Sequence, residues 1–200
     1  MKPAIPVITA ISLLLPSLAH ADDKADAILK EVHLRMRNVT TYSVTVVVED
    51  KKEKVNMRFW MQRPDKFRLD LTQNNNTRTI GLNGGRAITF EKGKASIPLS
   101  DKNLREPIDA MVTLISANFE QIFGGIKSTS YVTQKMLDEK TVVDIIDIIG
   151  KRPGESARLY IDNNSQIQKI AGRSATSHGT IYFINPVADA PIPETTFGIK

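Results

Sequence analysis

Apolar side chains recur at every second position in three successive segments, residues 42–48, 55–61 and 67–71. Because successive side chains of a strand point to opposite faces, this period of two predicts three strands, each with one apolar face. In the middle segment the apolar face consists of Val55, Met57, Phe59 and Met61. A chain built from such strands must cover a continuous apolar sheet surface.

The strand pattern continues along the rest of the chain. Residues 77–82 and 86–91 form a predicted hairpin around Asn83-Gly84-Gly85, which suits the positive φ angles of a tight turn. Further strands are predicted at residues 129–137, 140–149, 157–162, 166–171, 179–184 and 195–199. The sheet is therefore large and antiparallel.

Two segments have helical periodicity instead. The first places Ala25, Ile28, Leu29, Val32 and Met36 on one face, with Asp22 or Asp23 available as the N-cap. The second, residues 103–119, places Leu104, Ile108, Met111, Val112 and Ile115 on one face. We therefore expect a mainly β (α+β) fold, an incomplete antiparallel β-barrel of about 9–11 strands with two helices covering its concave hydrophobic face.

Two short helices are too few to fill a wide barrel completely, and large barrels can enclose a ligand cavity. A cavity is therefore expected, with an ordinary packed core as the alternative. The expected lining consists of the inward-facing apolar residues of the first strands and the second helix. These are Val44, Val46, Val55, Met57, Phe59, Met61, Phe67, Leu69, Leu71, Ile108, Met111, Val112 and Ile115.

The N-terminus has the layout of a secretory signal peptide. Lys2 precedes a mostly apolar run from Ile5 to Leu15, and Ala19-His20-Ala21 supplies small residues at the cleavage positions. We expect residues 1–21 to be removed and residues 22–200 to form a single soluble domain in the periplasm. An uncleaved membrane anchor is the alternative, but the apolar run is short for a bilayer, which needs roughly 20 residues.

Composition excludes several classes of function. The chain has no cysteine, which removes disulfides, thiolate chemistry and a lipidated cysteine from consideration. Its 27 Lys and Arg residues exceed its 22 Asp and Glu residues, for a net charge of +5. The positive charges are scattered rather than clustered, so nucleic acid is not an expected partner.

The sequence contains no recognisable catalytic apparatus, metal site or cofactor motif. Within residues 22–200 the only histidines are His33, on the polar side of the first helix, and His178, which follows Ser177 directly. Adjacent strand residues point to opposite faces, so Ser177 and His178 cannot act as a pair. Asp144 and Asp147 also fall on opposite faces of their strand. We expect a protein that is not an enzyme and needs no cofactor.

The segment Phe59-Trp60-Met61-Gln62-Arg63-Pro64-Asp65-Lys66-Phe67-Arg68-Leu69 resembles the signature strand pair of the LolA/LolB-like family. These proteins are periplasmic carriers and receptors of outer-membrane lipoproteins. Asn83-Gly84-Gly85-Arg86 is similar to the family's hairpin, and Pro107 begins a helical segment where the family has its lid. Leu69 departs from the pattern, because the family usually has an aromatic residue there.

The resemblance implies an incomplete barrel whose hydrophobic cavity, closed by helices, receives acyl chains. It implies that Arg63 latches the lid through Glu106, Asp109 or nearby backbone carbonyls. The alternative for Arg63 is that Pro64 bends the chain and lets the guanidinium reach solvent.

The function implied by the resemblance is a non-enzymatic, monomeric periplasmic carrier. It would bind the acyl chains of a lipoprotein or lipid for transfer toward the outer membrane, with an inner-membrane donor protein and an outer-membrane acceptor protein as partners. The alternative is an envelope sensor or regulatory module of the same fold that binds a partner protein.

Overall fold

The computed structural model describes residues 22–51, 53–74, 76–84, 86–91, 97–98, 102–115, 118–174 and 178–198. The predicted signal peptide, residues 1–21, lies outside the described residues. The strands are β1 (Thr41–Asp50), β2 (Lys54–Gln62), β3 (Lys66–Gln73), β4 (Asn76–Asn83), β5 (Arg86–Glu91), β6 (Ile97–Pro98), β7 (Ile126–Met136), β8 (Val142–Gly150), β9 (Ser156–Asp162), β10 (Ile167–Arg173) and β11 (His178–Ala188). The helices are α1 (Asp23–Asn38), α2 (Lys102–Ile115), α3 (Phe119–Ile122) and a single 3₁₀ turn, η1 (Glu194–Thr196).

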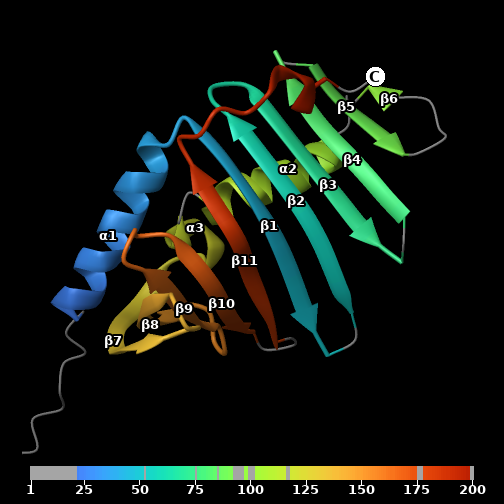
Figure 1. The fold of residues 1–200 in the computed structure, drawn as a ribbon. Helices are drawn as coiled ribbons and strands as arrows, with labels where there is room; N and C mark the ends of the chain where they lie inside the picture. Colours follow the sequence, from blue (N-terminus) through green and yellow to red (C-terminus); the bar gives the residue numbers. More distant parts are fainter. Residues whose placement is uncertain are drawn as a thin grey trace, which may run out of the picture.

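All the strands belong to one antiparallel sheet of 11 strands, ordered β6-β5-β4-β3-β2-β1-β11-β10-β9-β8-β7. Strands β1 to β6 form one meander and strands β7 to β11 form another, and the two meanders join where β1 pairs with β11. The sheet curves strongly but is not closed, because β6 and β7 are its two ends (Figure 1). The predicted incomplete barrel is confirmed.

The alternation of apolar and polar residues along each strand decides which side chains face the core. In β1, Val44 and Val46 lie on the concave face, where they pair with Phe59 and Met57 of β2. The same face of β8 and β9 contributes Ile146, Ile148, Leu159 and Ile161. Helix α2 lies behind β1 to β4 in Figure 1, and its Met111 and Ile115 pack into this same core.

Helix α1 covers a different part of the concave face, beside β7 (Figure 1). Its buried residues Ala25, Val32 and Met36 join the main core. The predicted cap is confirmed, because the Asp22 carboxylate accepts hydrogen bonds from the backbone N–H groups of Lys24 and Ala25. Its second oxygen accepts from the N–H of Tyr131 in β7 at 2.7 Å, so one carboxylate both starts the helix and attaches it to the sheet.

Two segments differ from the prediction. The expected strand at residues 195–199 is wrong over its described part, residues 195–198, because the chain forms the 3₁₀ turn η1 there, directly after Pro191 and Pro193, which cannot donate to a strand ladder. Phe197 then enters the core with 2% of its surface exposed. The second predicted helix, residues 103–119, is divided, because α2 ends at Ile115 and Asn118 caps the separate helix α3.

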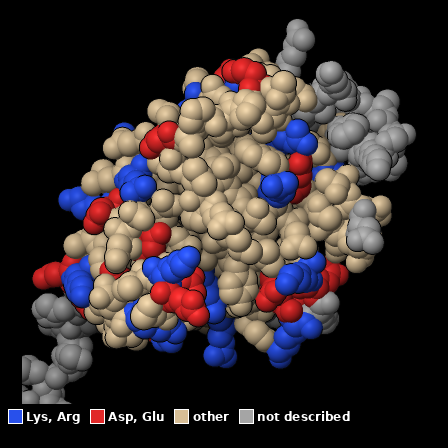
Figure 2. Space-filling view, in the orientation of Figure 1, with Lys and Arg blue, Asp and Glu red and all other residues tan. Residues whose placement is uncertain are grey.

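Charged side chains are dispersed over the face opposite α2. Among the described residues visible in Figure 2, Lys and Arg are interspersed with Asp and Glu and form no continuous basic patch. Ion pairs account for part of this mixing, including Arg68 with Asp70 at 2.9 Å and Arg158 with Asp147 at 2.7 Å. In the described part of the chain, no helix has the length and apolarity needed to cross a membrane.

Phe59 tests how strongly the concave core stabilises the fold. Its side chain is fully buried, and its ring centroid lies 6.4 Å from that of Phe67. We expect Phe59→Ala to lower the free energy of unfolding by about 3–5 kcal/mol, because it removes buried apolar surface and leaves a cavity. Urea denaturation followed by fluorescence of Trp60, the single tryptophan, measures this loss. Asn56→Ala, at an exposed position on the other face of β2, should change it by less than about 0.5 kcal/mol, and equal losses in the two variants would contradict this account.

Asp189 gives the fold a predictable response to acid. The backbone N–H of Thr40 donates to its carboxylate at 2.9 Å and, with the Thr40 hydroxyl, holds the pKa of Asp189 below its usual value against the opposing effect of burial. A carboxyl whose pKa is lower in the folded state stabilises the fold above its unfolded pKa of about 4, and this contribution disappears as pH falls through the folded pKa. Wild type should therefore be more stable than Asp189→Asn at pH 6, and the difference should shrink toward pH 2. Urea titrations across this range measure it, and a constant difference would contradict the assignment.

Candidate functional site

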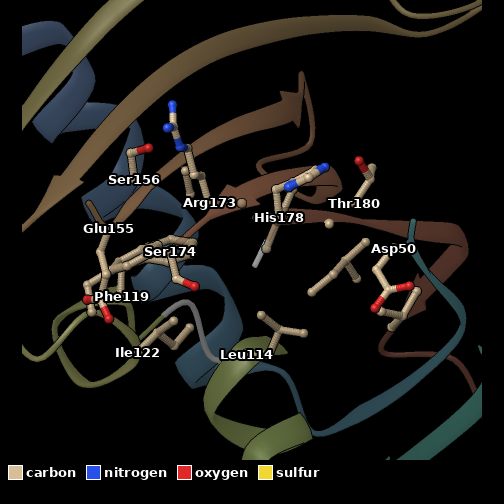
Figure 3. A pocket seen from close by; sticks show the side chains of 17 residues that line it. Asp50, Leu114, Phe119, Ile122, Glu155, Ser156, Arg173, Ser174, His178 and Thr180 are labelled. Atoms are coloured by element: carbon tan, nitrogen blue, oxygen red, sulfur yellow. The ribbon is translucent and has the colours of Figure 1, made fainter. Parts of the chain in front are cut away.

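An apolar pocket of about 380 Å³ lies on the concave face, between the sheet and helices α2 and α3 (Figure 3). Its sheet side is formed by β9, β10, β11 and the end of β1. Leu114 of α2 and Ile122 of α3 face it from the opposite side (Figure 3). The pocket thus lies where the helical cover passes from α2 to α3.

A row of small residues makes room for this pocket. Ala157 in β9 pairs with Gly172 in β10, Gly172 pairs with Gly179 in β11, and Gly179 pairs with Asp50 in β1. A Cβ atom added at Gly172 would meet no atom of the described residues within 4 Å, so these residues leave the space in front of this strand open. At Gly179 an added Cβ would approach the Glu49 carbonyl oxygen to 3.1 Å, so steric crowding favours glycine at this position.

The neighbouring row of the same sheet face supplies an apolar wall. Ile170 pairs with Leu159 on one side and with Ile181 on the other, and Ile181 pairs with Val48. Ile170, Ile181 and Val48 all line the pocket; Ile170 belongs to the main core, and Val48 and Ile181 pack against it. One row of large apolar residues beside one row of small residues therefore creates a groove that runs across the strands.

Helix α3 is positioned by local interactions that the sequence encodes. The Asn118 side chain accepts a hydrogen bond from the Gln121 N–H at 3.2 Å and caps the helix. Phe119 and Phe123 stack with their ring centroids 6.4 Å apart, and both line the pocket. The chain then turns through Gly124 at φ +61°, a conformation that favours glycine.

The polar residues of the pocket lie around its margin. Glu155 lies beside Phe119 at one end, and Asp50 lies at the other (Figure 3). Arg173 and His178 pair across β10 and β11 at the ends of these strands, and both are exposed. The interior can hold an apolar group, while polar groups would remain at the margin.

The residues predicted to line a cavity do not line this pocket. All except the half-buried Val55 belong to packed apolar clusters on the concave face or lie directly against them. Val44, Val46, Phe59, Met61, Leu69, Ile108, Met111 and Ile115 are at most 5% exposed, and Met57, Phe67, Leu71 and Val112 are partly buried beside them. The structure thus places eight of these residues in the packed core, four against it, and Val55 outside it.

Arg63 is exposed, as the alternative interpretation expected, and among the described residues its side chain bonds to helix α1 and not to the predicted lid. Its Nη2 donates to the carbonyl oxygen of Met36 at 3.3 Å, in the last turn of α1, where a cation is favoured by the helix dipole. Its backbone N–H donates to Thr40 at 2.9 Å. Glu106 and Asp109, the expected partners, are exposed on α2.

The described residues offer no arrangement typical of metal binding, since no three of their His, Asp or Glu side chains converge. His33 is exposed on α1 and His178 is exposed at the pocket margin.

Sequence patterns did not reveal the pocket residues because their significance depends on strand register. Gly172, Gly179 and Ala157 each look unremarkable in their own strand. They become a row only when β9, β10 and β11 are aligned, and periodicity alone does not fix that alignment. The one available signal was that all three have the inward parity of their strands.

Comparisons with known proteins show the fold. No protein-family model matches the chain, and no curated protein matches it. Among solved structures, MucB is 11% identical, with a TM-score of 0.58 over 90% of this chain and 64% of MucB. LprF from Mycobacterium bovis is 11% identical, with a TM-score of 0.58 over 86% of this chain and 96% of LprF.

The lipoprotein LppX of Mycobacterium tuberculosis is also similar, with 11% identity and a TM-score of 0.53 over 84% of this chain and 98% of LppX. MucB has also been solved in complex with MucA(peri), and this chain matches that structure with a TM-score of 0.52 at 12% identity. The chain spans less than two thirds of MucB's length but nearly all of LprF and LppX. It therefore has the same fold as MucB, LprF and LppX, at identities that establish the fold alone.

Proposed function

We propose that this chain is a non-enzymatic periplasmic carrier that binds an acyl chain of a lipoprotein or lipid in the pocket between the sheet and helices α2 and α3. The observation that carries the proposal is the open space in front of Gly172, bordered by Ile170 and Ile181 and covered by Leu114. Water gains few hydrogen bonds in such a space, whereas an aliphatic chain is favoured there.

The dimensions of the groove support a single extended acyl chain. Its volume of about 380 Å³ lies near the lower end of the roughly 300–1,000 Å³ typical of small-molecule sites. The row from Ala157 to Asp50 crosses three strand spacings of about 4.8 Å, which gives the groove a length of roughly 14 Å. A chain of this length can lie across the strands with its head group at the margin.

The energetics favour reversible binding, which a carrier needs. Burial of about ten methylene groups would contribute about 8 kcal/mol. Association costs at least about 4 kcal/mol in lost translational and rotational freedom. The binding free energy that remains after this cost corresponds to weak or moderate affinity. Such an affinity allows cargo to be passed from a donor to an acceptor.

The proposed setting follows from the sequence. The signal-peptide pattern of residues 1–21 supports export to the periplasm, and the Arg63-Pro64 segment resembles proteins that carry lipoproteins toward the outer membrane. An inner-membrane donor and an outer-membrane acceptor are the partners such a carrier would require.

A regulatory module that binds a protein is the second candidate. It is favoured by the similarity to MucB in complex with MucA(peri). Affinity purification of the protein from its own envelope discriminates between the two: a carrier should retain lipid without a stoichiometric protein, and a regulator should retain a protein that added lipid displaces.

A substitution that fills the groove tests the proposal directly. We expect Gly172→Phe to lower the affinity for a fluorescent fatty-acid probe by at least about tenfold, which is a loss of at least about 1.4 kcal/mol of binding free energy. Folding should be retained because the new Cβ meets no atom within 4 Å among the residues that the structure describes. The probe is titrated by fluorescence, and circular dichroism confirms the fold. Gly172→Leu provides a smaller group should phenylalanine impair folding.

Ala171→Phe is the matched control, because residue 171 adjoins Gly172 but has the opposite strand parity. It should bind the probe like wild type. The carrier proposal fails if wild type takes up no probe and native mass spectrometry of the protein from its envelope detects no lipid. It fails equally if the folded Gly172 variants and the Ala171 variant bind alike.

A further inference from the structure

A second hollow lies on the convex face of the sheet, opposite the face that the helices cover, where β11, β1 and β2 run side by side (Figure 1). Its volume is about 170 Å³, and we call it the convex hollow. Ser43 and Thr45 line it and flank the core residue Val44 in β1, so their side chains point to the convex face. The other lining residues are Arg58 and Trp60 of β2 and Ile184 and Asn185 of β11.

A β-bulge at this place brings Asn185 to the convex hollow. The pairing of β1 with β11 shifts between Ser43 and Thr45. Two residues of β11, Asn185 and Pro186, stand there opposite the single residue Val44 of β1. Asn185 has a φ angle of +51°, which asparagine adopts more readily than most residues. Because a bulge bends its strand and redirects a side chain, Asn185 lines the hollow together with residues of β1 and β2.

The polar side chains that line the convex hollow all carry hydrogen-bond donors, and none of them is a carboxylate. Arg58 has a guanidinium group, Asn185 has an amide, and Ser43 and Thr45 have hydroxyl groups. Within the described part of the chain, none of these four side chains makes a hydrogen bond or an ion pair. All four can therefore donate to a bound group.

The charge beside the hollow is positive. Asp70 of β3 pairs across the strands with Arg58, but the guanidinium of Arg68 already donates to both of its carboxylate oxygens, at 2.9 and 3.0 Å. The Thr79 hydroxyl donates to the same carboxylate at 2.7 Å. The guanidinium carbons of Arg58 and Arg68 each lie 5.5 Å from the centre of the Trp60 ring. Two guanidinium groups thus share one carboxylate, and the charge of Arg58 is left for a ligand.

We infer that the convex hollow binds the phosphate group of an organic phosphate ester. Arg58 offers two parallel N–H donors to phosphate oxygens, and donors on three strands suit a group whose oxygens point in several directions. Trp60 and Ile184 provide apolar surface for the carbon atoms that carry the phosphate. The hollow lies on the face opposite the acyl pocket, so this inference does not depend on the proposed carrier function.

The fluorescence of Trp60 reports on this site directly, because Trp60 lines the hollow and is the single tryptophan of the chain. The purified protein is titrated with glycerol 3-phosphate, with inorganic phosphate and with glycerol at constant ionic strength, since salt screens charge interactions. Both phosphates should change the emission in a saturable way, and glycerol should not. The indole N–H signal of Trp60 in ¹⁵N NMR spectra provides a second readout of the same titrations.

Three variants locate the binding. Arg58→Gln should weaken it by at least about tenfold, because it removes charge-assisted hydrogen bonds, and Thr45→Val by about threefold, because it removes one neutral donor. Lys127→Gln is the matched control: it also removes one positive charge from an exposed position, but it lies in β7, five strands away from β1. It should bind glycerol 3-phosphate like wild type. Circular dichroism checks the fold of each variant.

Vesicles of phosphatidylglycerol distinguish a lipid head group from a soluble ester as the source of the phosphate. If the source is a lipid, wild type should sediment with the vesicles and Arg58→Gln should not. If it is a soluble ester, the vesicles should not compete with glycerol 3-phosphate. The inference is wrong if neither the soluble phosphates nor the vesicles bind, if Arg58→Gln binds like wild type, or if Lys127→Gln loses as much affinity as Arg58→Gln. None of these outcomes bears on the acyl-carrier proposal.

Discussion

The concave face of the sheet is apolar across almost all of its 11 strands, and it has to be kept from water. The described structure meets this requirement with two different covers: α1 beside β7, and α2 behind the first meander. Burial of this face is the dominant favourable contribution to the fold. Helix α1 is attached at both of its ends by polar contacts, because Asp22 accepts a hydrogen bond from Tyr131 and the Met36 carbonyl accepts one from Arg63.

The pocket arises where this covering changes. Helix α2 ends at Ile115, and only the short helix α3 continues over β9, β10 and β11. At the same place, glycine and alanine replace the large inward-facing residues of these strands. The shorter helical cover and the small residues of the sheet together leave a groove with an apolar wall. Among the described residues, the pocket is thus an interruption of core packing at the transition from α2 to α3.

The sequence was sufficient to predict the fold, because the signals for it are local. Alternation at residues 42–71 identified β1, β2 and β3, and the helical period with Asp22 identified α1. The prediction of a closing strand at residues 195–199 failed because prolines and the burial of Phe197 outweighed β-forming residues. The site was harder to predict because it depends on register between strands and on the division of one predicted helix into α2 and α3.

The sequence reasoning looked for a cavity among large apolar residues such as Met57 and Leu71, which pack against the core. It did not consider small residues such as Gly172, although a pocket forms where side chains are missing from a face.

The central claim is that an acyl chain lies along the groove in front of Gly172. Nuclear Overhauser effects between the protons of a bound ¹³C-labelled acyl chain and assigned methyl groups of the protein test it most directly. The account predicts contacts to the methyl groups of Ile170, Ile181 and Leu114. Contacts confined to Met57, Leu71 and Val112, with none to those three residues, would contradict it.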